Sequence, residues 1–274
     1  MPSPTEITVS QLARLIGLPS SPLLVDVRTK DEFEAASSHL IPGSIHRSVH
    51  DIDALANLVG KRAAIIICGD GGAISQGIAA WLRHAGITAE TLEGGFSAWQ
   101  KAGQSLVDAS KLPERDPHGR TVWVTRARPK VDRIACPWLI RRFIDPEAVF
   151  LFVAASDVLE AAKRFSATPF DIPGVFWSHR DANCSFDTII EEFGLAVPAL
   201  DRLATIVRGA DTARPDLAPE ASGLLAASLG FSRIYRDDLE QLAAAMSLYD
   251  AFYRWARDAT DETHNWTEPA GAKP

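Results

Sequence analysis

Residues 64–86 read AIIICGDGGAISQGIAAWLRHAG, and this stretch decides the fold of the first half of the chain. The run 64–67 is short, apolar and rich in β-branched residues, which is typical of a strand buried on both faces. A helix is predicted at 74–85, because Ile74 and Ile78 recur at helical spacing before Gly86. Cys68 lies between the strand and the helix.

The order of strand, glycine-rich loop and helix is a setting for nucleophilic sulfur chemistry. Glycines let backbone N–H groups converge, and a helix N-terminus adds partial positive charge. A thiolate or persulfide anion at Cys68 would be stabilised by such donors. The alternative, from the loop alone, is a buried cysteine beside an ordinary strand-to-helix turn. The loop residues assigned to Cys68 are Gly69, Asp70, Gly71, Gly72, Ala73 and Ile74.

Further motifs flank the loop on both sides. Residues 23–27 read LLVDV, a second buried strand pattern whose end carries Asp26 and Arg28. Residues 39–45 read HLIPGSI, and residues 92–99 read LEGGFSAW. Strands that alternate with helices predict an α/β sandwich around a parallel sheet.

In order, spacing and residue type these motifs resemble the single-domain rhodanese family, over about residues 5–104. The resemblance implies a rhodanese fold for a domain at residues 1–107, with a central parallel sheet and helices on both faces. It also implies that Cys68 accepts sulfur from thiosulfate or a persulfide and passes it to a thiol or cyanide. Asp26 and Arg28 match the family's strand-end pair, for which we expect a supporting ion pair.

The loop departs from the family's pattern in its charge. Rhodaneses that use thiosulfate well usually have arginine or lysine late in the loop, where this chain has Gly72 and Ala73. The loop's one charged residue is Asp70, and its carboxylate repels a dianionic donor. The sequence therefore predicts weak use of thiosulfate and better use of a persulfide, with no cofactor required for sulfur transfer.

Composition excludes several function classes. The 274 residues suit two ordinary domains, and 46% hydrophobic residues suffice for a buried core. A net charge of −7 argues against general binding to nucleic acid or to an anionic membrane. No apolar run approaches the length of a membrane span. The start does not read as a secretion signal, and three scattered cysteines form no CxxC pair, which predicts free thiols in a cytoplasmic protein.

The second half of the chain is predicted to be a separate domain. Residues 108–120 carry glycine, proline and charge with little apolar periodicity, which indicates a linker. Residues 121–259 have the patterns of a helix-rich α+β domain, and the polar stretch 260–274 is expected to be poorly ordered. Helices are predicted at 186–193, 199–208, 219–229 and 237–259, and strands at 122–124, 149–153 and 175–177.

A local excess of positive charge opens this second domain. Arginine side chains suit planar or tetrahedral oxyanions, which indicates an oxyanion site. If residues 133–143 are helical, Pro137 either kinks the helix or marks its first turn. The alternative is that the arginines pair with acids elsewhere or form a solvated face. The candidate oxyanion ligands are Arg126, Arg133, Arg141 and Arg142.

A second group of residues suggests a divalent metal. Residues 178–187 read SHRDANCSFD, and an aspartate follows the next predicted helix. Imidazole, thiolate and carboxylate groups are ligands of divalent metals. The alternative is helix capping together with a histidine hydrogen-bonded in the core. The candidate metal ligands are His179, Cys184, Asp187 and Asp211.

Residues 121–258 also resemble the C-terminal domain of ChrB-type chromate resistance proteins. The matching stretches are WVTR at 123–126, DRIACPWLIRRFID at 132–145, PFD at 169–171, His179, CSFD at 184–187 and IVR at 206–208. The resemblance implies a role in the response to chromate and supplies no reaction. Full ChrB-type regulators resemble winged-helix proteins at their N-terminus, where this chain has rhodanese motifs, so we expect no DNA binding.

Two classes of function remain open. The first is a sulfurtransferase coupled to an oxyanion- or metal-handling domain in chromate or thiol stress. Its partners would be a persulfide donor, a thiol acceptor, and chromate or another oxyanion. The second is a binding or sensor module whose rhodanese domain has lost efficient turnover. Gly72 and Ala73 favour the second class, whereas the retained Cys68 favours the first.

Overall fold

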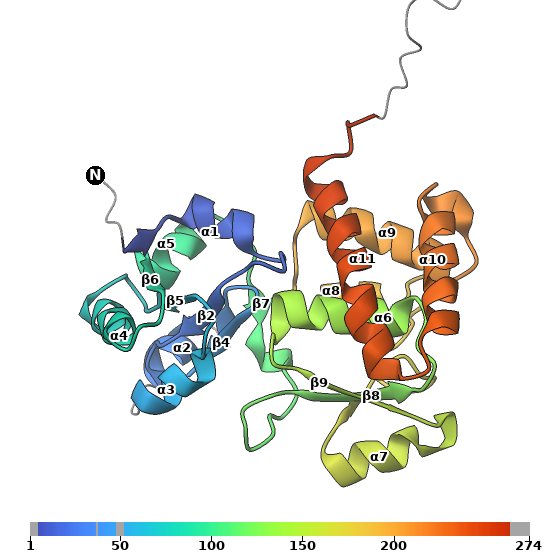
Figure 1. Cartoon of the computed structure of the whole chain (residues 1–274), viewed down its shortest axis with the longest axis horizontal. Coiled ribbons are helices and arrows are strands. Elements are labelled where there is room, and N and C mark those ends of the chain that lie inside the picture. Colours follow the sequence, from blue (N-terminus) through green and yellow to red (C-terminus); the bar gives the residue numbers. More distant parts are fainter. Residues whose placement is uncertain (1–4, 37, 48–51, 264–274) are drawn as a thin grey trace, which may run out of the picture.

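The computed structural model describes residues 5–36, 38–47 and 52–263 of the chain. Figure 1 shows two lobes, an N-terminal one around a sheet and a C-terminal one made mostly of helices. Most of the tail predicted at 260–274 lies outside the described residues, which end at 263.

The N-terminal lobe contains a five-stranded sheet in the order β1-β6-β5-β2-β4. Every neighbouring pair in this sheet is parallel, which confirms the predicted central parallel sheet. The elements of this lobe are β1 (Glu6–Ile7), α1 (Val9–Leu15), β2 (Leu23–Asp26), α2 (Lys30–Ala35), β3 (His39–Leu40), β4 (Ser44–His46), α3 (Ile52–Val59), β5 (Ala64–Ile67), α4 (Ala73–His84), β6 (Ala89–Leu92), α5 (Gly95–Lys101) and β7 (Val107–Asp108).

Helices cover both faces of the sheet, as predicted. Side chains alternate along each strand, so Leu24 and Ile65 belong to the apolar cluster that includes residues of α1 and α5. Val25 and Ile66 belong to the other cluster, with residues of α3 and α4. Because both faces are buried, the strands read as continuous apolar runs in the sequence.

The helix α4 begins close to where the sequence predicted it but turns a different face inward. Ser75, Ile78 and Leu82 are buried along one stripe, at helical spacing. Ile74, expected on the inner face, is 55% exposed. A polar residue in the first turn therefore occupies the inner position that the apolar pattern assigned to Ile74.

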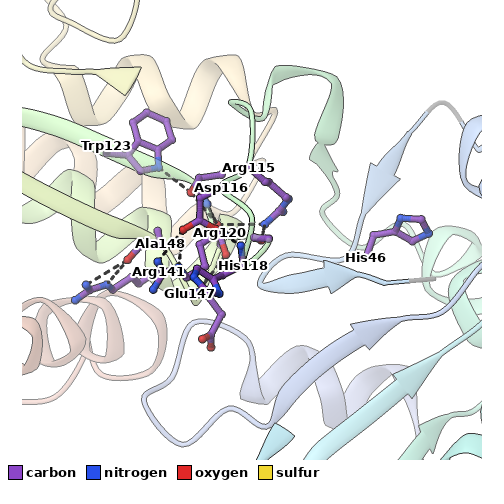
Figure 2. A network of polar contacts seen from close by, with 12 residues as sticks. His46, Arg115, Asp116, His118, Arg120, Trp123, Arg141, Glu147 and Ala148 are labelled. Carbon is purple, nitrogen blue, oxygen red and sulfur yellow. Dashed lines mark hydrogen bonds and ion pairs between the residues drawn. The ribbon is translucent and has the colours of Figure 1, made fainter. Parts of the chain in front are cut away.

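The segment predicted as a linker, 108–120, is folded onto the rest of the chain. It begins within β7, which pairs antiparallel with β3. The Asp116 carboxylate accepts hydrogen bonds from the amide and guanidinium of Arg120, which closes a turn. Arg47 donates to the carbonyl of Gly119. Figure 2 shows Asp116, His118 and Arg120 gathered in this turn, with His46 pointing away on the N-terminal lobe.

The C-terminal lobe combines a small parallel sheet, in the order β10-β8-β9, with a group of helices. This arrangement agrees with the helix-rich α+β domain expected from the sequence. Its elements are a 3₁₀ turn (Ala109–Lys111), β8 (Val122–Arg126), α6 (Asp132–Leu139), a π-helical turn (Ile140–Ile144), β9 (Val149–Val153), a 3₁₀ turn (Ala155–Asp157), α7 (Val158–Phe165), β10 (Thr168–Pro169), α8 (Ser185–Glu192), α9 (Pro198–Asp211), a 3₁₀ turn (Pro215–Leu217), α10 (Ala221–Ile234) and α11 (Asp238–Asp258).

Two local predictions in this lobe need correction, and the structure decides between the two alternatives for Pro137. The strand predicted at 175–177 is reduced to one bridge between Phe170 and Trp177, because the chain turns at Gly174 with a positive φ of 80°. The helix predicted to end at residue 229 runs on to 234, since Gly230 keeps a helical backbone and does not adopt the positive φ of a glycine that ends a helix. Pro137 does not open a helix: it lies inside α6, and a π-helical turn follows.

The longest helix is α11, with 21 residues. Its N-cap Asp237 accepts the amides of Leu239 and Glu240, and its buried residues include Leu242 and Tyr249. Its exposed residues include charged ones, such as Glu240 and Arg254, together with Leu239 and Ala243. Over the described ranges, no helix is both long enough and apolar enough to cross a membrane.

The two lobes share one apolar core, which the sequence did not predict. A single cluster joins Leu12 of α1 and Trp99 of α5 to Trp138 of α6. Gly17 is buried at this junction, where an added Cβ atom would lie 2.4 Å from Cζ of Phe143. The C-terminal lobe therefore packs against the side of the N-terminal lobe on which α1 and α5 lie.

Candidate functional sites

The Cys68 loop is clamped to the start of α5. The carbonyl oxygen of Cys68 accepts the amide of Phe96 at 2.9 Å, and the carbonyl of Gly69 accepts the amide of Ser97 at 2.9 Å. Gly95 has a φ of 58°, and a Cβ atom there would lie 2.4 Å from the Cys68 carbonyl oxygen. The glycine pair in the LEGGFSAW motif therefore lets α5 approach and brace the loop.

The sulfur atom of Cys68 lies in a largely apolar environment. Cys68 is 6% exposed and belongs to the aliphatic cluster that contains Val25 and Ile78. Its Sγ atom lies 3.0 Å from Oγ of Ser75. The amide of Gly72, one of the loop amides that we expected near the sulfur, donates instead to the Asp70 side chain at 3.1 Å. Among the described residues, the side-chain group hydrogen-bonded to the sulfur is the Ser75 hydroxyl.

Ser75 is a functional candidate that the sequence analysis missed. Its hydroxyl lies 3.1 Å from the carbonyl of Gly72 as well as 3.0 Å from Sγ. A hydroxyl has one proton to donate. A Cys68 thiol can donate to Ser75 while Ser75 donates to Gly72, whereas a thiolate needs the Ser75 proton for itself. The position of a serine in the first turn of the helix, facing the loop, is the signal that could have identified it.

Asp26 and Arg28 form the supporting pair that the resemblance implied. The Nη2 atom of Arg28 lies 2.6 Å from Oδ2 of Asp26, and both side chains are buried. The guanidinium also donates to the carbonyl of His39 and stacks 3.6 Å from the ring centre of Phe96. The pair therefore ties the end of β2 to β3 and α5, with its charge compensated inside the protein.

A wide depression of about 480 Å³ adjoins the Cys68 loop. Gly69 and Asp70 line it from the loop, and Glu32 lines it from α2. Arg28 lies in its wall but is already paired with Asp26. The charged groups that face this depression without an internal counter-charge are therefore acidic.

The four arginines proposed for an oxyanion divide into two pairs. Arg126 and Arg133 both approach Oδ2 of Asp171, at 3.5 and 3.3 Å. Arg142 makes two hydrogen bonds of 2.8 Å to Asp250. Three of the four guanidinium groups are thus paired with acids, which is the alternative left open by the sequence.

Arg141 and Arg142 line a pocket of about 200 Å³ at the junction of the lobes. Arg62 of the N-terminal lobe lines the same pocket and pairs with Glu147. Arg141 donates to the carbonyl of Ala148 (Figure 2), and burial lowers its pKa. The pocket is several times larger than the volume of one water molecule, about 30 Å³, so a small oxyanion fits in it.

A third site gathers three carboxylates around one imidazole. Nε2 of His179 lies 3.2 Å from Oδ2 of Asp211, 3.3 Å from Oδ1 of Asp171 and 3.5 Å from Oδ2 of Asp132. Of the four metal ligands suggested by the sequence, the structure brings His179 and Asp211 together. It adds Asp132 and Asp171, which lie in the DRIACPWLIRRFID and PFD stretches that carried the ChrB resemblance.

The other two suggested ligands serve the start of α8. Asp187 accepts the amide of Cys184 at 2.9 Å, an N-terminal capping contact. Arg208 pairs with the same carboxylate at 2.7 Å. Cys184 is fully buried, and burial raises the pKa of its thiol well above the ordinary value. The capping role, which the sequence left open, is therefore the one the structure displays.

Asp132 is held in place by contacts from three helices. The Val131 that precedes it has a φ of 33°, a conformation that costs a β-branched residue about 1–3 kcal/mol. Ser228 accepts the amide of Val131, and Tyr249 donates to its carbonyl. The amide of Ser185 donates to Asp132 at 2.6 Å. These buried bonds fix the carboxylate at the start of α6.

The electrostatics of this cluster are unusual for a protein surface. Hydrogen bonds with Asp171 and Asp211 raise the pKa of His179 to about 10. Burial, followed by the charges of Asp211 and Asp171, raises the pKa of Asp132 well above its ordinary value. Strongly perturbed groups that converge in this way are common at functional sites.

Comparisons with known proteins match the two lobes to two different family models. Residues 8–102 match the family model described as Rhodanese-like domain, and residues 123–256 match the model described as ChrB, C-terminal domain. Protein ChrB of Cupriavidus metallidurans is 38% identical over 152 residues. The match covers 53% of this chain and 45% of that protein, so the chain spans less than half of this curated relative.

Solved structures similar to the chain include a Rhodanese-like domain protein from Staphylococcus aureus, with 28% identity over 35% of this chain and 90% of that one, and a TM-score of 0.28. A rhodanese-related protein from Thermoplasma volcanium has 20% identity over 38% and 97%, with a TM-score of 0.33. Thiosulfate sulfurtransferase from Pseudomonas aeruginosa has 21% identity over 51% and 27%, with a TM-score of 0.34. On the family models and the observed sheet, the chain carries a rhodanese-like domain followed by a ChrB C-terminal domain.

Proposed function

We propose that the chain is a sulfurtransferase in which Cys68 carries the transferred sulfur as a persulfide. The observation that carries the proposal is the braced loop between β5 and α4, with Ser75 Oγ 3.0 Å from the sulfur. The Cys68 thiolate attacks the outer sulfur of a persulfide donor, whose S–S bond breaks as the donor leaves as a thiolate. An acceptor thiolate then takes the outer sulfur and restores the Cys68 thiolate.

The charges around the loop favour a persulfide over thiosulfate as the donor. Asp70 and Glu32 line the adjoining depression, and the charge of Arg28 is compensated by Asp26. A dianion would meet these carboxylates, and the cation that lines the depression among the described residues, Arg28, is neutralised by Asp26. A donor with a thiol-type leaving group suits this environment better.

For the second domain we propose a role in the response to chromate or thiol stress, in the cytoplasm. The support is the match to the ChrB C-terminal domain and the arginine-lined pocket at the junction of the lobes. Chromate or a similar oxyanion would bind against Arg141, which has no carboxylate partner among the described residues, beside Arg62 and Arg142, whose charges Glu147 and Asp250 offset. This domain would connect the oxidant to the sulfur carried by the first domain, without binding DNA or a membrane.

A second candidate function is a sensor or binding module that does not turn over. The observation that favours it is the burial of Cys68 among aliphatic side chains, which limits access to the sulfur. In that case the role of the Cys68 loop would be structural only.

Mass spectrometry separates the two candidates. The full chain is treated with a small-molecule persulfide or with thiosulfate, and its peptides are then mapped. A gain of one sulfur, about 32 Da, at Cys68 supports the transferase. The gain should vanish in Cys68→Ser and persist in Cys184→Ser, which changes a different buried thiol. No gain with either donor would contradict the transferase and support the sensor or binding module.

A further inference from the structure

We propose that Asp132, His179 and Asp211 bind one divalent first-row metal ion, such as Zn²⁺ or Mn²⁺. One atom from each residue lies within 4.8 Å of the others. The site belongs to the C-terminal domain, and the inference does not depend on sulfur transfer at Cys68.

The spacing of the donor atoms fits a coordination shell. Around an ion with bonds of about 2.1 Å, neighbouring ligand atoms lie about 3.0–3.4 Å apart. Nε2 of His179 lies 3.2 Å from Oδ2 of Asp211 and 3.5 Å from Oδ2 of Asp132. One imidazole nitrogen with two carboxylates is a donor set that suits Zn²⁺ and Mn²⁺. Mg²⁺ and Ca²⁺ prefer oxygen donors alone.

Asp132 provides the observation that points most directly to a cation. It is fully buried, and its Oδ1 atom has no hydrogen-bond partner among the residues that the structure describes. The neighbouring Cys184 thiol is at most a weak donor to this carboxyl group. A buried carboxylate oxygen without a partner is costly. Oδ1 belongs to the same carboxylate as Oδ2, the Asp132 atom that lies 3.5 Å from His179, so a cation bound by both oxygens would satisfy it.

Asp211 is also placed where a carboxylate alone is unfavourable. It is the last residue of α9, a helix of 14 residues, whose C-terminal end carries partial negative charge. Across residues 5–36, 38–47 and 52–263, no arginine or lysine pairs with Asp211 or Asp132. A cation between the two carboxylates would offset both the helix dipole and their mutual repulsion.

Asp171 differs from the three proposed ligands, because two arginines already compensate it. Arg126 and Arg133 approach its Oδ2 atom, while Ser185 donates to Oδ1 at 2.8 Å. We therefore assign Asp171 a positioning role beside His179. His179 is 42% exposed, so an ion can reach the site from solvent and retain water as a further ligand.

The test is a titration of the full chain with Zn²⁺ by calorimetry, after treatment with a chelator. We expect one equivalent to bind, with at least about tenfold weaker binding in Asp211→Asn and in His179→Gln. Asp187→Asn is the matched control, because Asp187 was a candidate from sequence but caps α8. It should bind Zn²⁺ like the wild type.

A thermal unfolding curve with and without Mn²⁺ gives a second readout. The ion should raise the melting temperature of the wild type and of Asp187→Asn by the same amount, and that of Asp211→Asn by less, because weaker binding stabilises the folded state less. Circular dichroism checks that each variant is folded. If the wild type binds neither ion, a proton on His179 balances the charges and the proposal is wrong. Equal binding by Asp211→Asn, or equal loss in Asp187→Asn, would also overturn it.

Discussion

The Cys68 loop and the His179 cluster differ in how their parts are spread along the chain. Cys68 and Ser75 lie within one strand–loop–helix unit, so the sequence displays most of that site as a local motif. Asp132, His179 and Asp211 come from α6, a loop and the end of α9, and they meet only through tertiary packing. The comparison teaches that local chemistry can be read from spacing, whereas an assembled site needs the fold.

The largest expected effect separates the two regions completely. Cys68→Ser should reduce sulfur transfer from a persulfide to a thiol to the background rate, because serine cannot hold the extra sulfur. Asp187→Asn, in the other lobe, should leave the rate unchanged. The measurement is the initial rate of sulfur transfer by the full chain. Residual transfer in Cys68→Ser would mean that another thiol carries the sulfur.

The next effect tests the long-range contact that braces the local motif. Gly95→Ala should destabilise the protein by about 3–5 kcal/mol, because the new Cβ would lie 2.4 Å from the Cys68 carbonyl oxygen at a φ of 58°. Gly86→Ala is the matched control: its φ is also positive, but its surroundings are open. It should cost only about 1–2 kcal/mol. Urea unfolding measures the free energy of unfolding of both variants. An equal loss of stability in the two would show that the contact between Gly95 and the Cys68 loop does not brace the loop.

A smaller effect concerns the hydroxyl beside the sulfur. Ser75→Ala should slow persulfide formation about tenfold, since it removes the donor to the Cys68 thiolate. Its effect on stability should be near 1 kcal/mol. Ser75→Thr, which keeps a hydroxyl, should recover part of the rate. A Ser75→Ala rate equal to that of the wild type would show that the hydroxyl supports the helix alone.

The smallest effect lies in the turn between the two regions. The Arg120 side chain lowers the pKa of Asp116 to about 2. A depressed carboxyl pKa stabilises the protein above the unfolded value, about 3.9, and this contribution disappears as the pH falls toward 2. The difference in melting temperature between the wild type and Asp116→Asn should therefore shrink between pH 5 and pH 2. A constant difference would assign the effect to hydrogen bonding alone.

Much of the N-terminal lobe could be predicted from the sequence. The buried strand runs, the helix after Cys68 and the Asp26–Arg28 pair each depend on residues close together in the chain. Even there the inner face of α4 was wrong at Ile74, because a polar residue bonded to the loop took the buried position. The spacing of apolar residues in the sequence does not reveal such a polar contact.

The C-terminal lobe could be predicted only in part. The helices were visible, but the one predicted at 219–229 continues through Gly230 to residue 234, because a glycine in the sequence does not by itself show whether its φ is positive. Asp132 was not among the predicted metal ligands, since nothing local marks it as buried. The partners of Arg126 and Arg133 lie about forty residues away, so charge density alone suggested a free cationic site.

Gly17 has a consequence for any attempt to divide the chain. Aromatic rings from Phe143 and Tyr253 press against its backbone, and Arg257 donates to the carbonyl of Arg14 nearby. If the chain is cut between residues 108 and 120, each fragment exposes an apolar surface that the other fragment covers in the full chain. When the two fragments are produced together, we expect them to associate through these complementary surfaces. The chain could then serve as a split reporter.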